Sequence, residues 1–515
     1  MGSFTGQLSH VLFSSPLWHW SPWVLVGLAF LGFTSLTLLL GLYNYFLHPV
    51  ANIRGPFLAA VSPLYLVRSV WSRRLNQDIQ ALHRKYGRVV RIAPNELSFS
   101  SERAMRDVHN PVVPDAFTKK GTSEDLILRL VFSSTNLLTV DDEESHKRLR
   151  SALQPAFTAK AIREQQEITQ FHVQKTLDSL LAAAENPNQT VSLTHELNKY
   201  VWGNVGHLSF GEPVSEEQLA HHERSKDIHA VVAPLLEYFQ YLTSMPMVGT
   251  LVRLVVAGMR TMFGFSGNIL GKSQLQRRIA RQDGQKNFLV AILGSKESAG
   301  LSTDEIHSNM LLLLMGGYDS SAVTLSAAFY HLLTHPEHYK RLQTELRGAF
   351  SSTDEVASGN LLQLPVLNAC LKETLRLVPP FNGHGSHRIA AKDVVVDDVK
   401  VPAGTLLSTD MYTMQRDPDC WAFPEEYRPE RWLNEFNGAG TPFEKDVTST
   451  WRPFALGHRG CIGREMAMHS LRMAIATIVH ACDMKMVNTD FVWDRDAGNH
   501  YMWHDYDIKV TVSKA

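Results

Sequence analysis

The sequence has little cysteine and almost no net charge. Its four cysteines, Cys370, Cys420, Cys461 and Cys482, include no C-x-x-C pair. They therefore indicate neither a disulfide framework nor a structural zinc site, and they favour a reducing compartment. The formal net charge is −1, and no long run of like charge occurs. Nucleic acid is not an expected partner, because such a chain has no field that attracts it.

Charged residues are absent from the first 53 positions. Within this region, WVLVGLAFLGFTSLTLLLGLYNYFL (residues 23–47) is long enough to cross a hydrocarbon layer of roughly 30 Å as a helix. A cleaved signal peptide or a buried core helix would be the alternatives, but a signal peptide has a basic start and a shorter apolar stretch. The first arginines follow the span, which places the rest of the chain in the cytosol. We expect a short lumenal segment at 1–22, a transmembrane anchor at 23–47 and a proline hinge at 48–56.

Beyond the hinge, the pattern is mainly helical. Residues 87–101 alternate β-branched and polar residues around Pro94-Asn95, which predicts two short strands. Helical periodicity then dominates residues 101–380. Short strands and loops follow, including 393–407, with one more helical run after Gly463. We find no repeat and no low-complexity linker. The predicted fold is mainly α with a minor β portion.

One predicted helix is unusually long and apolar, running from Ser302 to the break at Pro336. It contains Gly316 and Gly317, and each glycine costs about 1 kcal/mol relative to alanine in a helix interior. Two explanations remain open. The glycines permit a close helix crossing, or they line a groove for a flat ligand, with water and the polar pair Asp319 and Ser320 entering a loosened turn.

Glu373 and Arg376 stand three positions apart on another predicted helix. Such a pair is usually exposed and contributes only a few tenths of a kcal/mol. Downstream, however, Arg431 offers a second guanidinium. One carboxylate bridged by two arginines would form a buried ionic lock.

The stretch FALGHRGCIG (residues 454–463) places Cys461 among three glycines. Gly457, Gly460 and Gly463 permit left-handed turns and close backbone approach. A lone cysteine is more often a small core residue. Here the glycine setting and the absence of a second nearby cysteine indicate a single thiolate ligand to haem iron. His458 and His469 are rival ligands, but neither has this glycine scaffold.

Taken together, these residues resemble the cytochrome P-450 haem-thiolate monooxygenases, in the form found in membrane-bound proteins of filamentous fungi. The F-x-x-G-x-x-x-C-x-G and E-x-x-R patterns of that family are both present. In the central helix, serine replaces the family's threonine at Ser320. The matching positions are Phe454, Gly457, Cys461, Gly463, Glu373, Arg376, Pro429-Glu430-Arg431, Gly316, Gly317, Asp319, and His146 with Arg150 for the W-x-x-x-R helix.

The resemblance covers almost the whole chain and implies the cytochrome P-450 fold, with one catalytic domain at 57–515 behind the anchor. It implies haem b with Cys461 as the axial thiolate, which favours O–O cleavage. Asp319 and Ser320 would relay protons to oxygen. The haem propionates would be bound by Arg150, Arg388 and Arg459, with His146.

The resemblance also implies a reaction and its partners. One oxygen atom from O2 would enter a lipophilic small molecule, in a fungal secondary-metabolite pathway to a terpenoid, polyketide or alkaloid. Electrons would come from NADPH through NADPH-cytochrome P-450 reductase at the endoplasmic reticulum membrane. The alternatives are a peroxide-using haem-thiolate isomerase or dehydratase, and a non-catalytic haem sensor.

Two surfaces follow from the same resemblance. The substrate pocket would draw on residues 120–136, Met315, 378–382 and 500–502, which are mostly apolar. The reductase would meet a basic face of Lys147, Arg148, Arg452 and Arg464, although these are equally well explained as ordinary solvated charges.

Overall fold

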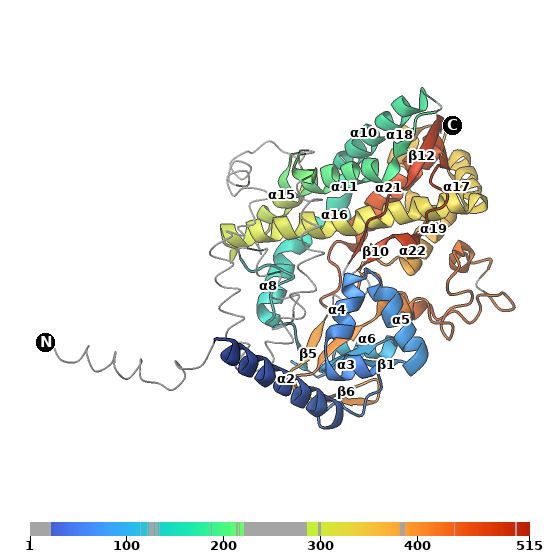
Figure 1. Cartoon of the computed structure of the whole chain (residues 1–515). Helices are drawn as coiled ribbons and strands as arrows, with labels where there is room; N and C mark the ends of the chain where they lie inside the picture. Colours follow the sequence, from blue (N-terminus) through green and yellow to red (C-terminus); the bar gives the residue numbers. More distant parts are fainter. Residues whose placement is uncertain are drawn as a thin grey trace.

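The computed structural model (Figure 1) describes residues 22–113, 115–120, 122, 128, 132, 134–186, 188–212, 215, 217–220, 275, 286–296, 300–381, 387–436, 438–499 and 502–515. The expected lumenal segment lies outside these residues except for its last position. So do much of the predicted pocket segment 120–136, and Asn382, His500 and Tyr501.

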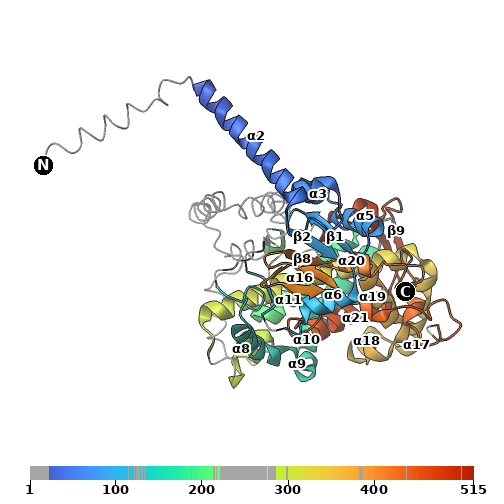
Figure 2. The ribbon, with the colours of Figure 1, turned by 90° about the horizontal axis from the view of Figure 1, so that it is seen from below.

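Helix α2 (Pro22–Phe46) projects away from the rest of the molecule, as Figure 2 shows most clearly. Its most apolar stretch is long enough to cross a membrane, and none of it is buried against the protein. Trp23 is 82 % exposed. An exposed, uncharged apolar helix of this length is a candidate membrane span.

The end of α2 and the segment that follows it are fastened to the globular part. The Arg91 guanidinium donates to the carbonyl of Asn44 (2.8 Å), and the Arg91 amide donates to the carbonyl of Arg54 (2.9 Å). A Cβ at Gly55 would lie 2.1 Å from the Arg91 carbonyl oxygen, so only glycine fits there. The expected proline hinge is therefore packed against the strand that carries Arg91.

The remaining helices form most of the molecule. They are α3 (Phe57–Val61), α4 (Leu64–Trp71), α5 (Leu75–Tyr86), α6 (Glu102–His109), α8 (Glu143–Leu153), α9 (Ala159–Glu164), α10 (Gln166–Ala184), α11 (Leu193–Phe210), α15 (Phe288–Leu293), α16 (Thr303–Thr334), α17 (Pro336–Ala349), α18 (Thr353–Ser358), α19 (Pro365–Leu377), α20 (Met411–Met414), α21 (Arg464–Ala481) and α22 (Trp493–Asp496). Short 3₁₀ turns occupy η2 (Gln154–Phe157), η4 (Leu361–Gln363), η5 (Pro429–Trp432) and η6 (Thr448–Thr450).

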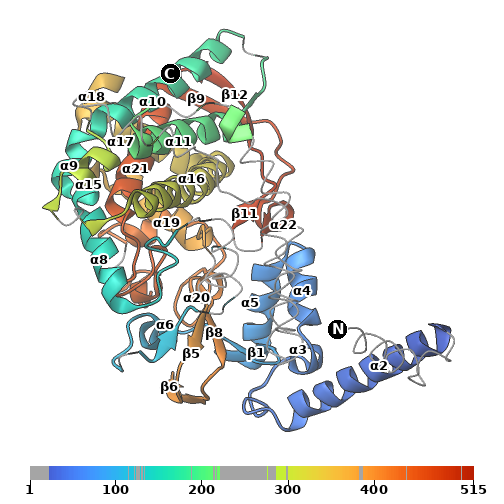
Figure 3. The same ribbon diagram turned by 90° about the vertical axis from the view of Figure 1, so that its left-hand side faces the viewer.

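Helix α16 is the central element, and Figure 3 shows it nearly end-on among its neighbours. It starts at a capping box, in which Ser302 and Glu305 each bond the other's backbone amide, and it stops before Pro336. By length and composition it too is able to cross a membrane, but 56 % of its most apolar stretch is buried inside the protein. It is a core helix, packed against α11, α19 and α21.

The strands form small sheets beside the helices. The largest has the order β1-β2-β8-β5-β3, in which β2 and β8 are parallel and the other pairs antiparallel. A second has the order β4-β12-β9, and two hairpins pair β6 with β7 and β10 with β11. The strands are β1 (Val89–Ala93), β2 (Glu96–Phe99), β3 (Phe117–Thr118), β4 (Val191–Ser192), β5 (Arg388–Ala390), β6 (Val394–Val396), β7 (Val399–Val401), β8 (Leu406–Thr409), β9 (Cys482–Met486), β10 (Gly498–Asn499), β11 (Trp503–His504) and β12 (Lys509–Lys514).

This architecture confirms the predicted fold class. The two strands expected in 87–101 are β1 and β2. The region after residue 380 consists mainly of short strands and loops, with α21 as the helix expected after Gly463. One large apolar core surrounds α16, and a smaller one lies at the five-stranded sheet. The cysteine loop of residues 454–463 lies between the end of α6 and the start of α21.

Candidate active site

The cysteine loop is held by its own backbone. The Cys461 amide donates to the carbonyl of Phe454 (2.9 Å), and the Gly460 amide donates to that of Gly457 (3.0 Å). At Gly457 φ is +76°, and a Cβ there would lie 2.6 Å from the carbonyl oxygen of His109. Both the backbone conformation and the available space therefore require glycine at this position.

Of the three glycines, only Gly457 adopts the left-handed conformation that glycine permits. Gly463 has φ of −87°, and Gly460 is not left-handed either. A Cβ at Gly460 would lie 3.1 Å from the carbonyl oxygen of Gly457, so this glycine permits a close approach instead. The second left-handed residue of the loop is Ala455, at +58°. Alanine rarely adopts this conformation, so sequence alone gave no sign of it.

Cys461 lies just before the amino terminus of α21. Water can reach its side chain, yet burial raises the pKa of its thiol, while the amides of Gly463 and Arg464 act in the opposite direction. The side chain is therefore within reach of water although protein atoms surround the sulfur. Helix α21 begins three residues later, and its amino terminus favours a negatively charged sulfur.

The two glycines of α16 have different surroundings. A Cβ at Gly317 would lie 2.9 Å from Cγ1 of Val205 on α11, so Gly317 serves the close crossing of two helices. Gly316 is exposed although it stands in the middle of a core helix, and a Cβ there would meet nothing within 4 Å. Asp319 and Ser320, one turn later, are partly exposed as well. The close helix crossing therefore holds for Gly317, whereas a groove beside Gly316 stays a prediction.

The expected loosened turn in α16 was wrong. The helix is continuous over Thr303–Thr334, and the Ser320 hydroxyl donates to the carbonyl of Gly316 at 2.7 Å. The Thr324 hydroxyl likewise donates to the carbonyl of Ser320. The polar side chains bond back onto the preceding turn without breaking it. Packing of α11 against Gly317 helps to offset the low helix propensity of the glycine pair.

The four residues expected to bind the haem propionates come from three parts of the chain. Arg150 of α8 donates to the carbonyl of Gly460 (2.8 Å), so it reaches the cysteine loop. Arg459 donates to the carbonyls of Val140 and Asp141 (2.9 and 2.6 Å). Burial, followed by Arg459, lowers the pKa of His146 to about 3, so this imidazole is neutral at physiological pH. Arg388 is buried at the start of β5 and donates to the His387 carbonyl (2.8 Å).

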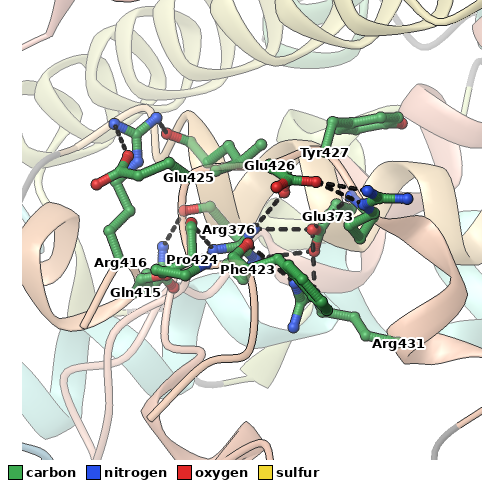
Figure 4. Close-up of polar contacts among 12 residues, drawn as sticks. Glu373, Arg376, Gln415, Arg416, Phe423, Pro424, Glu425, Glu426, Tyr427 and Arg431 are labelled. Atoms are coloured by element: carbon green, nitrogen blue, oxygen red, sulfur yellow. Dashed lines mark hydrogen bonds and ion pairs between the residues drawn. The ribbon is translucent and has the colours of Figure 1, made fainter. Parts of the chain in front are cut away.

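Glu373, Arg376 and Arg431 form one fully buried cluster, which Figure 4 shows in close-up. Arg376 donates from two nitrogens to the two oxygens of Glu373 (2.9 and 2.8 Å), and Arg431 donates to Glu373 Oε1 (3.1 Å). Burial opposes ionisation of Glu373, but the two guanidiniums outweigh it and lower its pKa. The three residues are arranged as the sequence predicted.

The cluster also contains partners that the sequence analysis missed. The Trp432 indole and the Arg428 amide donate to Glu373 (both 2.9 Å), and Asp446 pairs with Arg431. Arg376 further donates to backbone carbonyls of residues 415, 424 and 426. Helix α19 is therefore tied to the segment that leads into the cysteine loop. No local sequence pattern identifies these partners, because they meet only after folding.

The basic residues expected at the reductase face are exposed or partly exposed, but three of them face acids of this chain. Arg148 pairs with Glu305, Arg452 lies 3.8 Å from Glu102, and Arg464 lies 3.5 Å from Glu465. Lys147 is exposed. Of the expected pocket residues that the structure describes, Met315 on α16 is partly buried, Val378 is 1 % exposed and Phe381 is 42 % exposed.

Comparison with known proteins gives the class of the protein. Residues 55–512 match the family model described as Cytochrome P-450. The chain belongs to this family, and it is an oxygen-incorporating oxidoreductase.

Similar proteins are fungal. Cytochrome P-450 monooxygenase dpfgJ of Gibberella zeae is 59 % identical over 96 % of each chain. Cytochrome P-450 monooxygenase FUP2 of Fusarium proliferatum is 37 % identical over 98 % of this chain and 99 % of its own. Sesterfisheric acid synthase of Neosartorya fischeri is 34 % identical over 93 % of this chain and 95 % of its own.

Proposed function

We propose that the chain is a haem-thiolate monooxygenase that oxidises a lipophilic small molecule in fungal secondary metabolism. The observation that carries this is the placement of Cys461, a water-accessible thiol whose pKa is raised by burial, at the amino terminus of α21. The exposed Gly316 in the middle of a core helix and a group of cations beside the loop also suit a flat anionic cofactor. The names of the similar fungal proteins support small-molecule oxidation, and one of them is named as the synthase of an acid.

The residues present fit haem b. Cys461 would bind the iron, while Arg150, Arg388 and Arg459, with His146, would bind the propionates. Phe454, Gly457 and Gly463 shape the loop around the sulfur. When bound, such a cofactor supplies activation of O2. Glu373, Arg376 and Arg431 act as a structural lock. This lock keeps the segment that leads into the cysteine loop in place.

Asp319 and Ser320 would hold and deliver protons on the α16 side. In the structure the Ser320 hydroxyl donates a hydrogen bond to the Gly316 carbonyl, so it must rotate before it can donate to another group. Serine lacks the methyl group that restricts the rotamer of threonine. We expect Ser320→Ala to raise peroxide release relative to product, and Ser320→Thr to lower it. Equal ratios in parent and Ser320→Ala would remove Ser320 from the relay.

A spectroscopic experiment tests the proposed function first. The protein, produced in a eukaryotic host and reduced with dithionite, should give the thiolate type of carbon monoxide spectrum. An imidazole type of spectrum, or no pigment, would refute it. In membranes with NADPH-cytochrome P-450 reductase, consumption of NADPH and O2 upon feeding of candidate terpenoids, polyketides and alkaloids should identify the substrate. Product formation with peroxide alone and no use of NADPH would indicate the isomerase or dehydratase class.

We also propose that residues 23–47 anchor the protein in the endoplasmic reticulum membrane, with the catalytic domain of residues 57–515 in the cytosol. Exposed apolar residues near the anchor support this, including Phe57 of α3 (67 % exposed) and Trp71 of α4 (65 % exposed). The sequon at Asn188 provides a test, because Asn188 is exposed and would be glycosylated in the lumen. We expect a glycosidase to leave the electrophoretic mobility unchanged. A shift that Asn188→Gln abolishes would contradict the orientation.

A further inference from the structure

An irregular segment before α8 is bonded to the amino-terminal part of α16. The Ser308 hydroxyl donates to the carbonyl of Ser134 (2.7 Å), and the side-chain amide of Asn136 donates to Ser308 Oγ (3.1 Å). The backbone amide of Leu137 donates to Asn309 Oδ1 (2.9 Å). Asn136 and Asn309 are 0 % exposed, and Ser308 is 1 % exposed. We call these five residues the α16 clasp.

The segment held by the clasp has no regular secondary structure, yet its backbone amides are bonded. Within residues 136–140, Asn136 Oδ1 accepts the amides two and three residues later (both 3.0 Å), and the Asn136 carbonyl accepts the amide four residues later (3.0 Å). The Asn136 amide donates to Thr139 Oγ1 (3.0 Å). With the Leu137 bond of the clasp, all five amides have a partner, as a buried backbone requires.

The other end of this segment is bonded to the cysteine loop. The carbonyls of Val140 and Asp141 accept Arg459 (2.9 and 2.6 Å). Residues 134–141, which we call the clasp segment, therefore connect α16 with the loop that carries Cys461.

The clasp lies at the end of an accessible strip on α16. Residues three, four, seven and eleven positions after Asn309 share its face of the helix. These residues are Leu312, Leu313, Gly316 and Ser320, and all four are at least partly exposed, whereas Asn309 is fully buried. Asn309 and Gly316 are about 10 Å apart along the helix axis, at 1.5 Å per residue. The clasp segment thus covers this face of α16 at the point where the accessible strip ends.

We propose that Ser308 and Asn309 are positioning residues, which fix the clasp segment as an end wall of the substrate space along α16 and so limit the length of a lipophilic substrate. This inference rests on the proposed function. The two leucines of the strip provide apolar contact for such a molecule. Because the amides of residues 136–140 are already bonded, the wall offers no free backbone donor to a polar group.

A series of 1-alkylimidazoles of increasing chain length tests the proposal. The ring nitrogen binds haem iron, which changes the absorption spectrum, and the chain extends into the substrate space. In the haem-loaded parent, each added methylene should lower Kd about fourfold until the chain meets the wall. In Ser308→Ala and in Asn309→Leu, this trend should continue for at least one more methylene. The longest chains should then bind roughly fourfold or more tightly than they bind the parent.

Ser326→Ala is the matched control, because Ser326 is a buried serine of the same helix whose hydroxyl bonds to no residue that the structure describes. This variant should keep the parent's limiting chain length, and unsubstituted imidazole should bind equally to all four proteins. The same limiting length in the parent and in both clasp variants would overturn the proposal. A parent series without any limit would overturn it as well.

A second measurement depends on neither haem nor a ligand. Hydrogen exchange of the amides of residues 136–140, followed by mass spectrometry of the full chain in detergent, should be roughly tenfold to a hundredfold faster in Asn309→Leu, because the Leu137 amide loses its acceptor. Ser326→Ala should exchange as the parent does. Equal exchange in these two variants would overturn the inference. A parent that gives no haem spectrum with imidazole would instead refute the proposed function, so the two failures are distinguishable.

Discussion

The buried cluster around Glu373 makes a quantitative prediction about stability. Glu373→Gln preserves the shape of the side chain but removes the charge that faces Arg376 and Arg431, all three at most 1 % exposed. Removing one partner of a buried ion pair costs about 3–5 kcal/mol, because the remaining charge stays buried. Since 1.4 kcal/mol is a factor of ten, the unfolding equilibrium should shift by roughly a hundredfold to a few thousandfold.

The tryptophans of the cluster provide the assay. The Trp432 indole donates to Glu373 itself, and the Trp421 ring lies 5.3 and 5.5 Å from the guanidinium carbons of Arg376 and Arg431. Guanidinium unfolding of the haem-loaded protein in detergent, followed by tryptophan fluorescence, should show a lower midpoint for Glu373→Gln. Because folding lowers the pKa of Glu373, its contribution should persist at neutral pH and disappear only as the pH falls through that lowered value.

Glu426→Gln is a matched control from the same segment. Glu426 pairs with Arg428 at 2.6 Å, but their side chains are 52 % and 46 % exposed. Exposed pairs contribute at most about 1 kcal/mol, so this variant should unfold almost as the parent does. If Glu373→Gln is no less stable than Glu426→Gln, the buried cluster does not stabilise the fold as we describe.

Three further predictions concern single positions. In thermal unfolding, Gly317→Ala should destabilise the protein by about 1–3 kcal/mol, because its Cβ would meet Val205. Val205→Ala in the same chain should restore most of the lost stability. Gly316→Ala is the control, because its Cβ would meet nothing within 4 Å. Burial raises the pKa of Asp410 to about 7, so stability should fall as the pH rises from about 4 to about 7, by up to about 4 kcal/mol. Asp410→Asn should reduce the change of unfolding free energy with pH, measured by denaturant titrations at several pH values. An unchanged pH dependence in this variant would contradict the raised pKa of Asp410. Cys461→His should convert the carbon monoxide spectrum from the thiolate to the imidazole type, and an unaltered spectrum would exclude Cys461 as the ligand.

Features with a local signal were predictable from the sequence. The start of α16 follows from Ser302 and Glu305 within four residues, and the β1-β2 pair follows from alternation around a turn. Glu373 and Arg376 were found because they share one helix face. In each case the decisive contacts lie within a short stretch of chain.

Features set by packing were not predictable. The sequence around Gly316 and Gly317 does not indicate which of the two glycines contacts Val205, because Val205 lies on another helix. The Asp446 carboxylate and the Trp432 indole join the buried cluster only when the segment around them folds back on α19. The pairing of Phe117 with Ala390 depends on strand register, which the sequence of a two-residue strand does not specify.

Both larger sheets join strands that are far apart in the chain. Strand β2 pairs with β8, and β4 pairs with β12, in each case across more than 300 residues. At roughly 5–20 residues per second of translation, the earlier strand waits about 15–60 s for its partner. An open strand edge is a template for pairing with other chains during that time. We therefore expect production of this protein to be limited by aggregation of nascent chains, and to improve when chaperones are abundant.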